Sequence, residues 1–269
     1  MADVVAEIGV LGGSGLYALL EDARTVQVDT PYGEASAPVV VGAVQGRSVA
    51  FLPRHGARHE HPPHRVPYRA NLWALRSLGV RQVLAPCAVG GLQPGLGAGS
   101  LVAPDQLVDR TSGRVQTFYD RGAVHVPFAD PYCPSGRAVA VAAARAAGWP
   151  LTDGGTLVVV EGPRFSTRAE SRWFSAQGWS VVGMTGHPEA VLARELALCY
   201  AAVALVTDLD AGVEQGQSVT HAEVLRVFRE NTSRLKELLL EVVAALPAQQ
   251  GDCPCGHALD GLRPDPALP

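Results

Sequence analysis

Two carboxylates follow directly on a long apolar run late in the chain. Ala201 to Gly212 reads AAVALVTDLDAG, and the run ends in Asp208 and Asp210, with Thr207 beside them. A segment that is apolar on both faces is typical of a central strand, and ligands of open α/β sheets gather at strand carboxyl ends. We therefore expect both carboxylates at the mouth of a site. The alternative is an ordinary turn, where Asp and Gly are common.

A loop rich in basic side chains is the second candidate. It reads PRHGARHEHPPH and places Arg54, His55, Arg58, His59, His61 and His64 within eleven positions. Two prolines favour an irregular loop over a helix, and neither a cysteine nor a paired carboxylate completes a zinc set. Cationic and donor groups at a strand end suit an oxyanion such as phosphate. A solvated surface loop is the alternative.

The glycine-rich stretch GGSGLYA at residues 12 to 18 is the third candidate. Its backbone N–H groups and the Ser14 hydroxyl could approach an anion. It also contains Gly13-x-Gly15-x-x-Ala18, the start of a dinucleotide fingerprint. The following LLEDARTVQVDT offers barely two helical turns, too few for a Rossmann unit. A structural turn, a phosphate loop and a dinucleotide loop all remain open.

Strands and helices alternate along the chain, which predicts one α/β domain. Besides the run before Asp208, we expect strands at Glu7–Leu11, Val39–Val44, Ser48–Leu52, Arg81–Ala85, Gly155–Val160 and Val181–Thr185. Helices are expected at Tyr68–Leu78, Ala138–Ala147, Pro188–Leu198 and from Thr220 to about Leu246. The stretch PCAVGGLQPGLGAG after Ala85 and most of residues 101 to 134 are predicted as loops.

Capping signals mark three helix starts. Thr167 with Glu170, and Thr220 with Glu223, have the spacing of capping boxes. The second of these boxes places His221 at the first position of its helix. Pro188 and Glu189 mark a third start, so an anion bound beside Thr185 would lie near a helix N-terminus.

Composition excludes several protein classes. A formal net charge of -4 gives no electrostatic basis for binding nucleic acid. No apolar run is long enough to span a membrane, and no secretory leader is evident, so we expect a cytoplasmic protein. Five scattered cysteines do not resemble a secreted disulfide framework. Lys236 is the only lysine, which argues against a Schiff base or a Walker lysine.

The ends of the chain define the expected domain boundary. We expect one domain over residues 1 to 246 and a poorly ordered, Pro- and Gly-rich tail over residues 247 to 269. The tail contains Cys253, Cys255 and His257, a weak metal-binding pattern. We therefore expect no metal site.

From about Ile8 to Leu246 the chain resembles the trimeric nucleoside phosphorylase family, in particular its 5'-methylthioadenosine phosphorylases. The motifs that carry the resemblance are GGSGL at 12 to 16, RHG at 54 to 56, PYRANLWAL at 67 to 75, EGPRFSTRAES at 161 to 171, GMTGHPEAVLARE at 183 to 195 and TDLD at 207 to 210. The resemblance implies one α/β domain with a central mixed, barrel-like sheet flanked by helices. It also implies a homotrimer that needs no cofactor besides its co-substrate phosphate.

The resemblance assigns residues to the parts of a nucleoside site. Phosphate is expected at Ser14, Arg54, His55, Cys87, Ala88 and Thr185. Cys87 departs from the usual threonine, so its contact would pass to the backbone or be lost. The nucleoside is expected at Phe165, Ser166, Met184, Asp208, Asp210, His221 and Val224, with His125 of a neighbouring subunit closing the 5' end.

Two positions imply the purine that is bound. Related enzymes for 6-oxopurines have glutamate where this chain has Ser166 and asparagine where it has Asp208. A carboxylate accepts from a 6-amino group and repels a 6-oxo oxygen, and such hydrogen bonds discriminate by about 10⁴. At the 5' end the chain instead resembles the 6-oxopurine enzymes, because His221 matches the histidine that contacts the 5'-hydroxyl in them.

The expected activity is phosphorolysis of 5'-methylthioadenosine or a related 5'-modified 5'-deoxyadenosine, with Asp208 and Asp210 as the catalytic residues. Phosphorolysis of adenosine or of 6-oxopurine nucleosides is the alternative. A non-catalytic nucleoside sensor and an NAD-dependent oxidoreductase are further alternatives, and the short segment after the glycine loop argues against the oxidoreductase.

Overall fold

The computed structural model describes residues 6–13, 20–149, 151–211 and 220–262, apart from the side chain of His221. The strands are β1 Ile8–Gly12, β2 Glu21–Val26, β3 Val39–Val44, β4 Arg47–Pro53, β5 Gln82–Gly91, β6 Leu101–Ala103, β7 Gln106–Arg110, β8 Leu151–Asp153, β9 Thr156–Val160, β10 Val181–Gly183 and β11 Cys199–Leu209. The helices are α1 Tyr68–Ser77, α2 Pro134–Ala146, α3 Arg168–Ala176, α4 Gly186–Glu195 and α5 His221–Ala245, with 3₁₀ turns η2 Pro63–Arg65 and η3 Pro254–His257.

All the described strands belong to one mixed sheet, which confirms the expected α/β class. Its main path runs β2-β3-β4-β1-β5-β10-β9-β7, and β11, β6 and β8 branch from β5. β5 and β11 pair in parallel over almost their whole length. Buried and apolar, they form the centre of the sheet, as the unbroken apolar run before Asp208 predicted.

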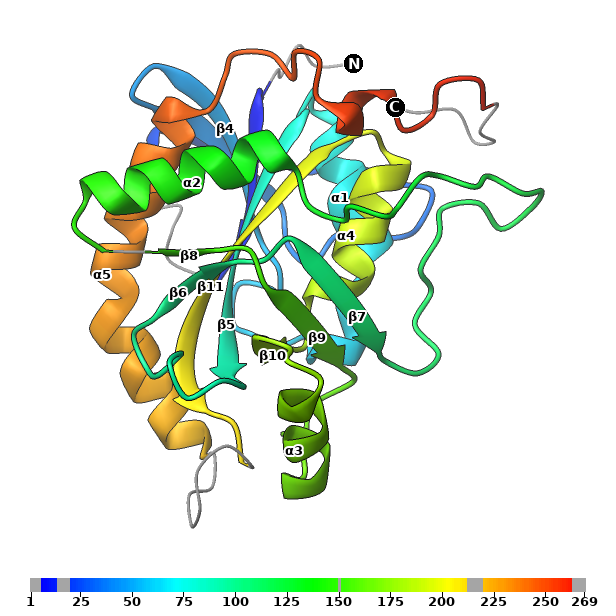
Figure 1. Ribbon diagram of the computed structural model, residues 1–269. Coiled ribbons are helices and arrows are strands. Elements are labelled where there is room, and N and C mark those ends of the chain that lie inside the picture. Colours follow the sequence, from blue (N-terminus) through cyan, green and yellow to red (C-terminus); the bar gives the residue numbers. More distant parts are fainter. Residues whose placement is uncertain (1–5, 14–19, 150, 212–219, 263–269) are drawn as a thin grey trace.

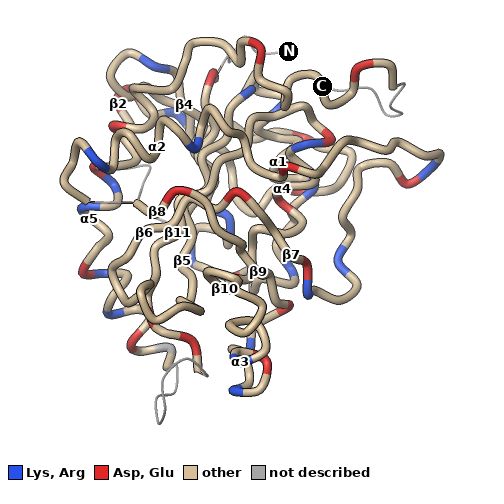
Figure 2. The backbone as a smooth tube through the Cα atoms, viewed as in Figure 1, with Lys and Arg blue, Asp and Glu red and all other residues tan. Residues whose placement is uncertain are grey.

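Helices cover the sheet from two sides (Figure 1). α1 and α4 pack together on one side, while α2 and α5 pack together on the other. The two largest clusters of buried apolar side chains match these two layers. Basic and acidic residues are interspersed along the chain (Figure 2). Within the described residues, no helix is long and apolar enough to cross a membrane.

Some segments differ from the sequence-based expectation, among them the strands β6, β7 and β8, which were not predicted. Glu21–Val26, in a segment whose sequence offered barely two helical turns, forms the exposed edge strand β2. β5 does not end at Ala85 but continues through PCAVGG to Gly91, because β11 pairs with it up to Leu209. Pairing with a long neighbouring strand therefore outweighs the local loop signal of proline and glycine.

The described part of the C-terminal tail, residues 247 to 262, packs against the domain. The side chain of Gln250 donates hydrogen bonds to the carbonyls of Arg81 (3.1 Å) and Ala197 (2.9 Å). Cys253 and Cys255 are buried. These contacts involve partners far away in the sequence, so the composition of the tail alone did not predict them.

Candidate functional site

The site lies along one edge of β5, where β1 and β10 pair with different stretches of the strand and leave a gap between them. β1 pairs with Gln82 to Leu84, and β10 pairs with Gly90 and Gly91. The five residues between these stretches, 85 to 89, pair with neither strand, while β11 covers the opposite edge. Ala88 is exposed in the middle of this otherwise central strand. Backbone N–H groups on this edge are thus available to a ligand.

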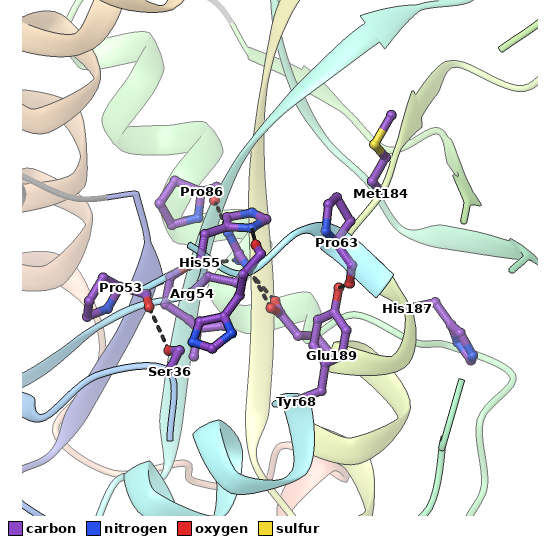
Figure 3. A network of polar contacts seen from close by, with 12 residues as sticks. Ser36, Pro53, Arg54, His55, Pro63, Tyr68, Pro86, Met184, His187 and Glu189 are labelled. Carbon is purple, nitrogen blue, oxygen red and sulfur yellow. Dashed lines mark hydrogen bonds and ion pairs between the residues drawn. The ribbon is translucent and has the colours of Figure 1, made fainter. Parts of the chain in front are cut away.

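We call the stretch of β5 that pairs with neither β1 nor β10, residues 85 to 89, the open edge. Arg54 lies at one end of the open edge, directly after β4. It is 3 % exposed, and its Nε and Nη2 donate to the two carboxylate oxygens of Glu189 in α4. Nη1 donates to the carbonyl of Pro86 (3.1 Å) and Nη2 to that of Leu11 (2.8 Å). Figure 3 shows Arg54 between Pro86 and Glu189. The guanidinium therefore joins β1, β4, β5 and α4 at this end.

His55 follows Arg54 and is neutral at physiological pH. Burial and the neighbouring Arg54 charge lower the pKa of His55 to about 4. Its Nδ1 lies 2.9 Å from the carbonyl of His61, which can only accept, so Nδ1 has the proton. Nε2 is then an acceptor. Such a nitrogen can receive a hydrogen bond from a protonated phosphate oxygen.

Cys87 and Thr185 supply further polar groups near this end. Burial raises the pKa of the Cys87 thiol to about 11, so the thiol stays protonated. Thr185 is the N-cap residue of α4, yet its hydroxyl does not cap the helix. Within the described residues, no hydrogen bond occupies this hydroxyl, and an unused hydroxyl at a helix N-terminus can bind an anion.

Asp208 and Asp210 lie at the other end of the open edge. A Cβ atom built on Gly90 would lie 3.3 Å from Asp208 Oδ1 and 3.4 Å from Asp210 Cβ, so both side chains flank the same glycine. Thr207 Oγ1 donates to Asp208 Oδ2 at 2.8 Å. Burial raises the pKa of Asp208 to about 6, with a further contribution from Asp210. Asp210 Oδ2 is buried and lacks a partner among the described residues.

The two ends of the site lie on the same strand, a short distance apart. Arg54 contacts β5 at Pro86, and Asp208 is paired with Gly90. Four residues of strand separate these contacts by about 13 Å. This span accommodates an anion, a sugar and a purine in a row, given the reach of the side chains at either end.

Arg114 links the loops beside the site through hydrogen bonds. It was not among the residues predicted from the sequence. Its buried guanidinium donates to the carbonyls of Met184 (2.9 Å), His187 (2.6 Å) and Glu161 (2.7 Å). Met184 in turn packs closely on Gly162, where a Cβ would lie 2.6 Å from the methionine sulfur. Glu189 was also missed as a site residue, because the sequence marked it only as an acidic residue in a helix start.

Other predicted residues lie in less enclosed positions. Phe165 is 37 % exposed and Ser166 is half-buried on the loop before α3. The Thr167–Glu170 capping box that starts α3 is confirmed. Val224 is half-buried in the first turn of α5, and His125 is exposed. Ser14 and the side chain of His221 lie outside the described residues.

Comparison with known proteins defines the class. The family model described as "Phosphorylase superfamily" matches residues 7–244. The chain is 63% identical to a purine nucleoside phosphorylase of Streptomyces coelicolor over 99% of both chains. It is 60% identical to an S-methyl-5'-thioadenosine phosphorylase of Mycolicibacterium smegmatis, covering 94% of this chain and 95% of that protein. The chain therefore belongs to the phosphorylase superfamily.

Solved structures place it more narrowly by likeness. A methylthioadenosine phosphorylase from an antarctic soil metagenomic library superposes with a TM-score of 0.91 at 41% identity, covering 96% of this chain and 92% of that chain. Methylthioadenosine phosphorylase from Schistosoma mansoni in complex with adenine gives a TM-score of 0.87 at 38% identity, covering 91% and 93%. These likenesses confirm the nucleoside phosphorylase fold expected from the sequence.

Proposed function

We propose that the protein catalyses phosphorolysis of 5'-methylthioadenosine, or of a related 5'-modified 5'-deoxyadenosine, to adenine and the 5-substituted ribose 1-phosphate. The observation that carries this proposal is that the side chains of Asp208 and Asp210 lie together beside Gly90. A protonated Asp208 can donate to purine N7, while Asp210 Oδ2, which has no partner among the described residues, can accept from a 6-amino group. A 6-oxopurine presents an acceptor at that position and would leave the carboxylate oxygen unpaired.

At the opposite end, the groups around the open edge suit inorganic phosphate. Its oxygens can accept hydrogen bonds from the Nη1 N–H of Arg54 that has no partner among the described residues, from the Thr185 hydroxyl and from the backbone N–H groups at Cys87 and Ala88. His55 Nε2 can accept from a protonated phosphate oxygen. Ser14 completes this set in our proposal. Bound phosphate attacks C1' as the bond to purine N9 breaks, and its negative charge stabilises the oxocarbenium-like transition state.

Asp208 makes the base a better leaving group. The electron pair of the breaking bond moves onto the purine, and a proton from Asp208 to N7 neutralises the charge that develops there. General acid catalysis of this kind contributes about 10²–10⁴ in rate. Met184 would lie against the ribose and Phe165 against the base. The reaction requires no metal or organic cofactor in this scheme.

We also propose a homotrimer in which His125 of the partner subunit closes the 5' end of the site. The segment between β7 and α2, which contains His125, extends away from its own sheet (Figure 1). An exposed arm of this kind can reach a neighbouring molecule. Sedimentation velocity should give a trimer, and His125→Ala should raise the KM for the nucleoside with little change in the KM for phosphate.

The decisive experiment measures adenine release from 5'-methylthioadenosine with and without phosphate. We expect release only with phosphate, together with one sugar phosphate for each adenine. Equal release without phosphate would indicate a hydrolase, and tight nucleoside binding without release would indicate a sensor. Dependence on NAD would indicate an oxidoreductase. Each of these results would overturn the proposal.

Adenosine is the second candidate substrate. α5 begins at His221, which the family resemblance matches to the histidine that contacts the 5'-hydroxyl in 6-oxopurine enzymes, and a relative named purine nucleoside phosphorylase is 63% identical. Rates for adenosine and methylthioadenosine should be compared before and after His221→Val. A shift of the ratio towards methylthioadenosine supports adenosine as a substrate, and an unchanged ratio contradicts this role of His221.

A further inference from the structure

Four of the five cysteines meet in one buried cluster, although they come from three distant segments. Cys133 is the N-cap residue of α2, Cys199 is the first residue of β11, and Cys253 and Cys255 flank the start of η3. Their sulfur atoms all lie within 4.8 Å of one another, and each residue is at most 5 % exposed. None of the four forms a disulfide. Composition alone gave no sign that these thiols come together.

The spacing of the sulfurs fits a metal ion. Cys133 Sγ lies 3.4 Å from Cys253 Sγ, and the other pairs lie no farther apart than 4.8 Å. Four thiolates around Zn²⁺, at about 2.3 Å each and in tetrahedral geometry, would lie about 3.8 Å from one another. The observed spacing brackets this value. Tetrahedral sets of four sulfur ligands are typical of zinc and of iron–sulfur centres, and sulfur atoms this close together have room for a single ion.

N–H donors point at three of the four sulfurs. The backbone N–H of Gly136 lies 3.4 Å from Cys133 Sγ, Gln250 Nε2 lies 3.5 Å from Cys199 Sγ, and Arg194 Nη2 lies 3.9 Å from Cys255 Sγ. The Cys133 sulfur also lies at the positive N-terminus of α2. Such donors and a cationic guanidinium favour the thiolate form, and they are the outer partners that metal-bound thiolates require.

We propose that Cys133, Cys199, Cys253 and Cys255 bind one structural Zn²⁺. All four positions are filled by protein ligands, so the ion would hold the fold together and take no part in catalysis. The cluster lies at the start of β11, whereas Asp208 lies nine residues further along this strand, about 30 Å away. The ion would join the C-terminal segment 247 to 262 to α2 and β11.

His257, which the sequence placed beside the two tail cysteines, is not part of the cluster. Its Nδ1 lies 2.9 Å from Asp260 Oδ2, and its side chain is 60% exposed. The proposal therefore concerns a four-sulfur site and does not depend on the proposed phosphorolysis. Failure of either proposal leaves the other intact.

The test measures metal content in the full chain, purified under reducing conditions without added metal. Elemental analysis should find one zinc per chain in the wild type and less than a tenth of that in the double variant Cys253→Ser/Cys255→Ser. Cys87→Ser removes the cysteine outside the cluster and is the matched control for metal content. Zinc that persists in the double variant would overturn the proposal.

A second measurement avoids variants that fold poorly. Apo wild-type protein, prepared with a chelator under reducing conditions, should take up one Co²⁺ per chain and show the charge-transfer and d–d bands of a tetrahedral thiolate site. Zn²⁺ should displace the cobalt and raise the melting temperature of the apo chain. A reduced, folded chain that takes up neither ion would overturn the proposal, and so would a chain whose cluster is held by disulfides and takes up no metal after reduction.

Discussion

Glu189 binds Arg54 through both of its carboxylate oxygens, in the buried layer between α4 and β5. Together with the carbonyls of Pro86 and Leu11, this pairing uses four of the five N–H groups of the guanidinium. Within the described residues, one N–H of Nη1 remains for a ligand. Arg54 therefore contributes one directed donor to an anion, and Glu189 fixes the direction of that donor.

Glu189→Gln should destabilise the protein by about 3–5 kcal/mol, because it leaves the Arg54 charge buried without its counterion. Chemical denaturation of both proteins at pH 7 measures the difference. Tyr200→Phe is the matched control, since it removes only the 2.8 Å hydrogen bond to the same carboxylate and should cost about 1 kcal/mol. Equal effects of the two substitutions would contradict a charge role for Glu189.

The pH dependence of kcat/KM for the nucleoside should report the protonation of Asp208. A group that donates a proton is active below its pKa, so activity should fall as pH rises through about 6. Thr207→Val removes a hydrogen bond that stabilises the carboxylate and should move this limb to higher pH. Asp210→Asn removes a like charge and should move it to lower pH.

Initial rates at saturating phosphate, measured between about pH 5 and pH 9, provide the profile for each variant. The two shifts have opposite signs, so they cannot both arise from general loss of stability. Shifts in the same direction, or a limb that stays in place in both variants, would assign the acid to another group.

Local patterns predicted those parts of the fold whose causes are local. The Thr167–Glu170 capping box needs only residues three positions apart, and both of its hydrogen bonds are present. The apolar run before Asp208 needs only its own composition to be recognised as a central strand. These elements could therefore be predicted from the sequence.

Features that depend on distant partners could not be predicted in the same way. Glu189 is 135 residues from Arg54 in the chain, and no spacing rule connects the two. β5 continues past Pro86 because β11 pairs with it, a relationship that the loop-like sequence PCAVGG conceals. The order of the tail depends on the same kind of contact, through Gln250 and the two cysteines beyond it.

Gly90→Ala should lower kcat while it leaves the fold intact. The added methyl group would lie 3.3 Å from Asp208 Oδ1 and 3.2 Å from a Val182 methyl group, so the carboxylate must move by a few tenths of an ångström. A misplacement of about 1 Å can cost about 100-fold in rate, so we expect this smaller displacement to cost up to about 10-fold. Gly95→Ala is the matched control, because its Cβ would meet no atom within 4 Å. Steady-state kinetics and melting temperatures measure both effects, and wild-type kcat in Gly90→Ala would show that the carboxylate has room to adapt.

Asp208→Asn should abolish most activity and yet stabilise the protein at neutral and alkaline pH. The folded chain holds the Asp208 proton up to a pKa of about 6, whereas an unfolded aspartate loses it near its ordinary value of 3.8. Between these values the folded state binds more protons, so the stability of the wild type falls as pH rises and stays reduced above that window. Two pKa units correspond to about 3 kcal/mol. The free energy of unfolding of the variant should therefore exceed that of the wild type by up to this amount at pH 8, and the difference should vanish near pH 4, roughly the ordinary aspartate pKa.

Urea denaturation at both pH values measures this difference in the free energy of unfolding. Asp252→Asn, at an exposed position, is the control for loss of one charge. A stability difference that is the same at both pH values would show that burial of the Asp208 charge does not limit the stability of the fold.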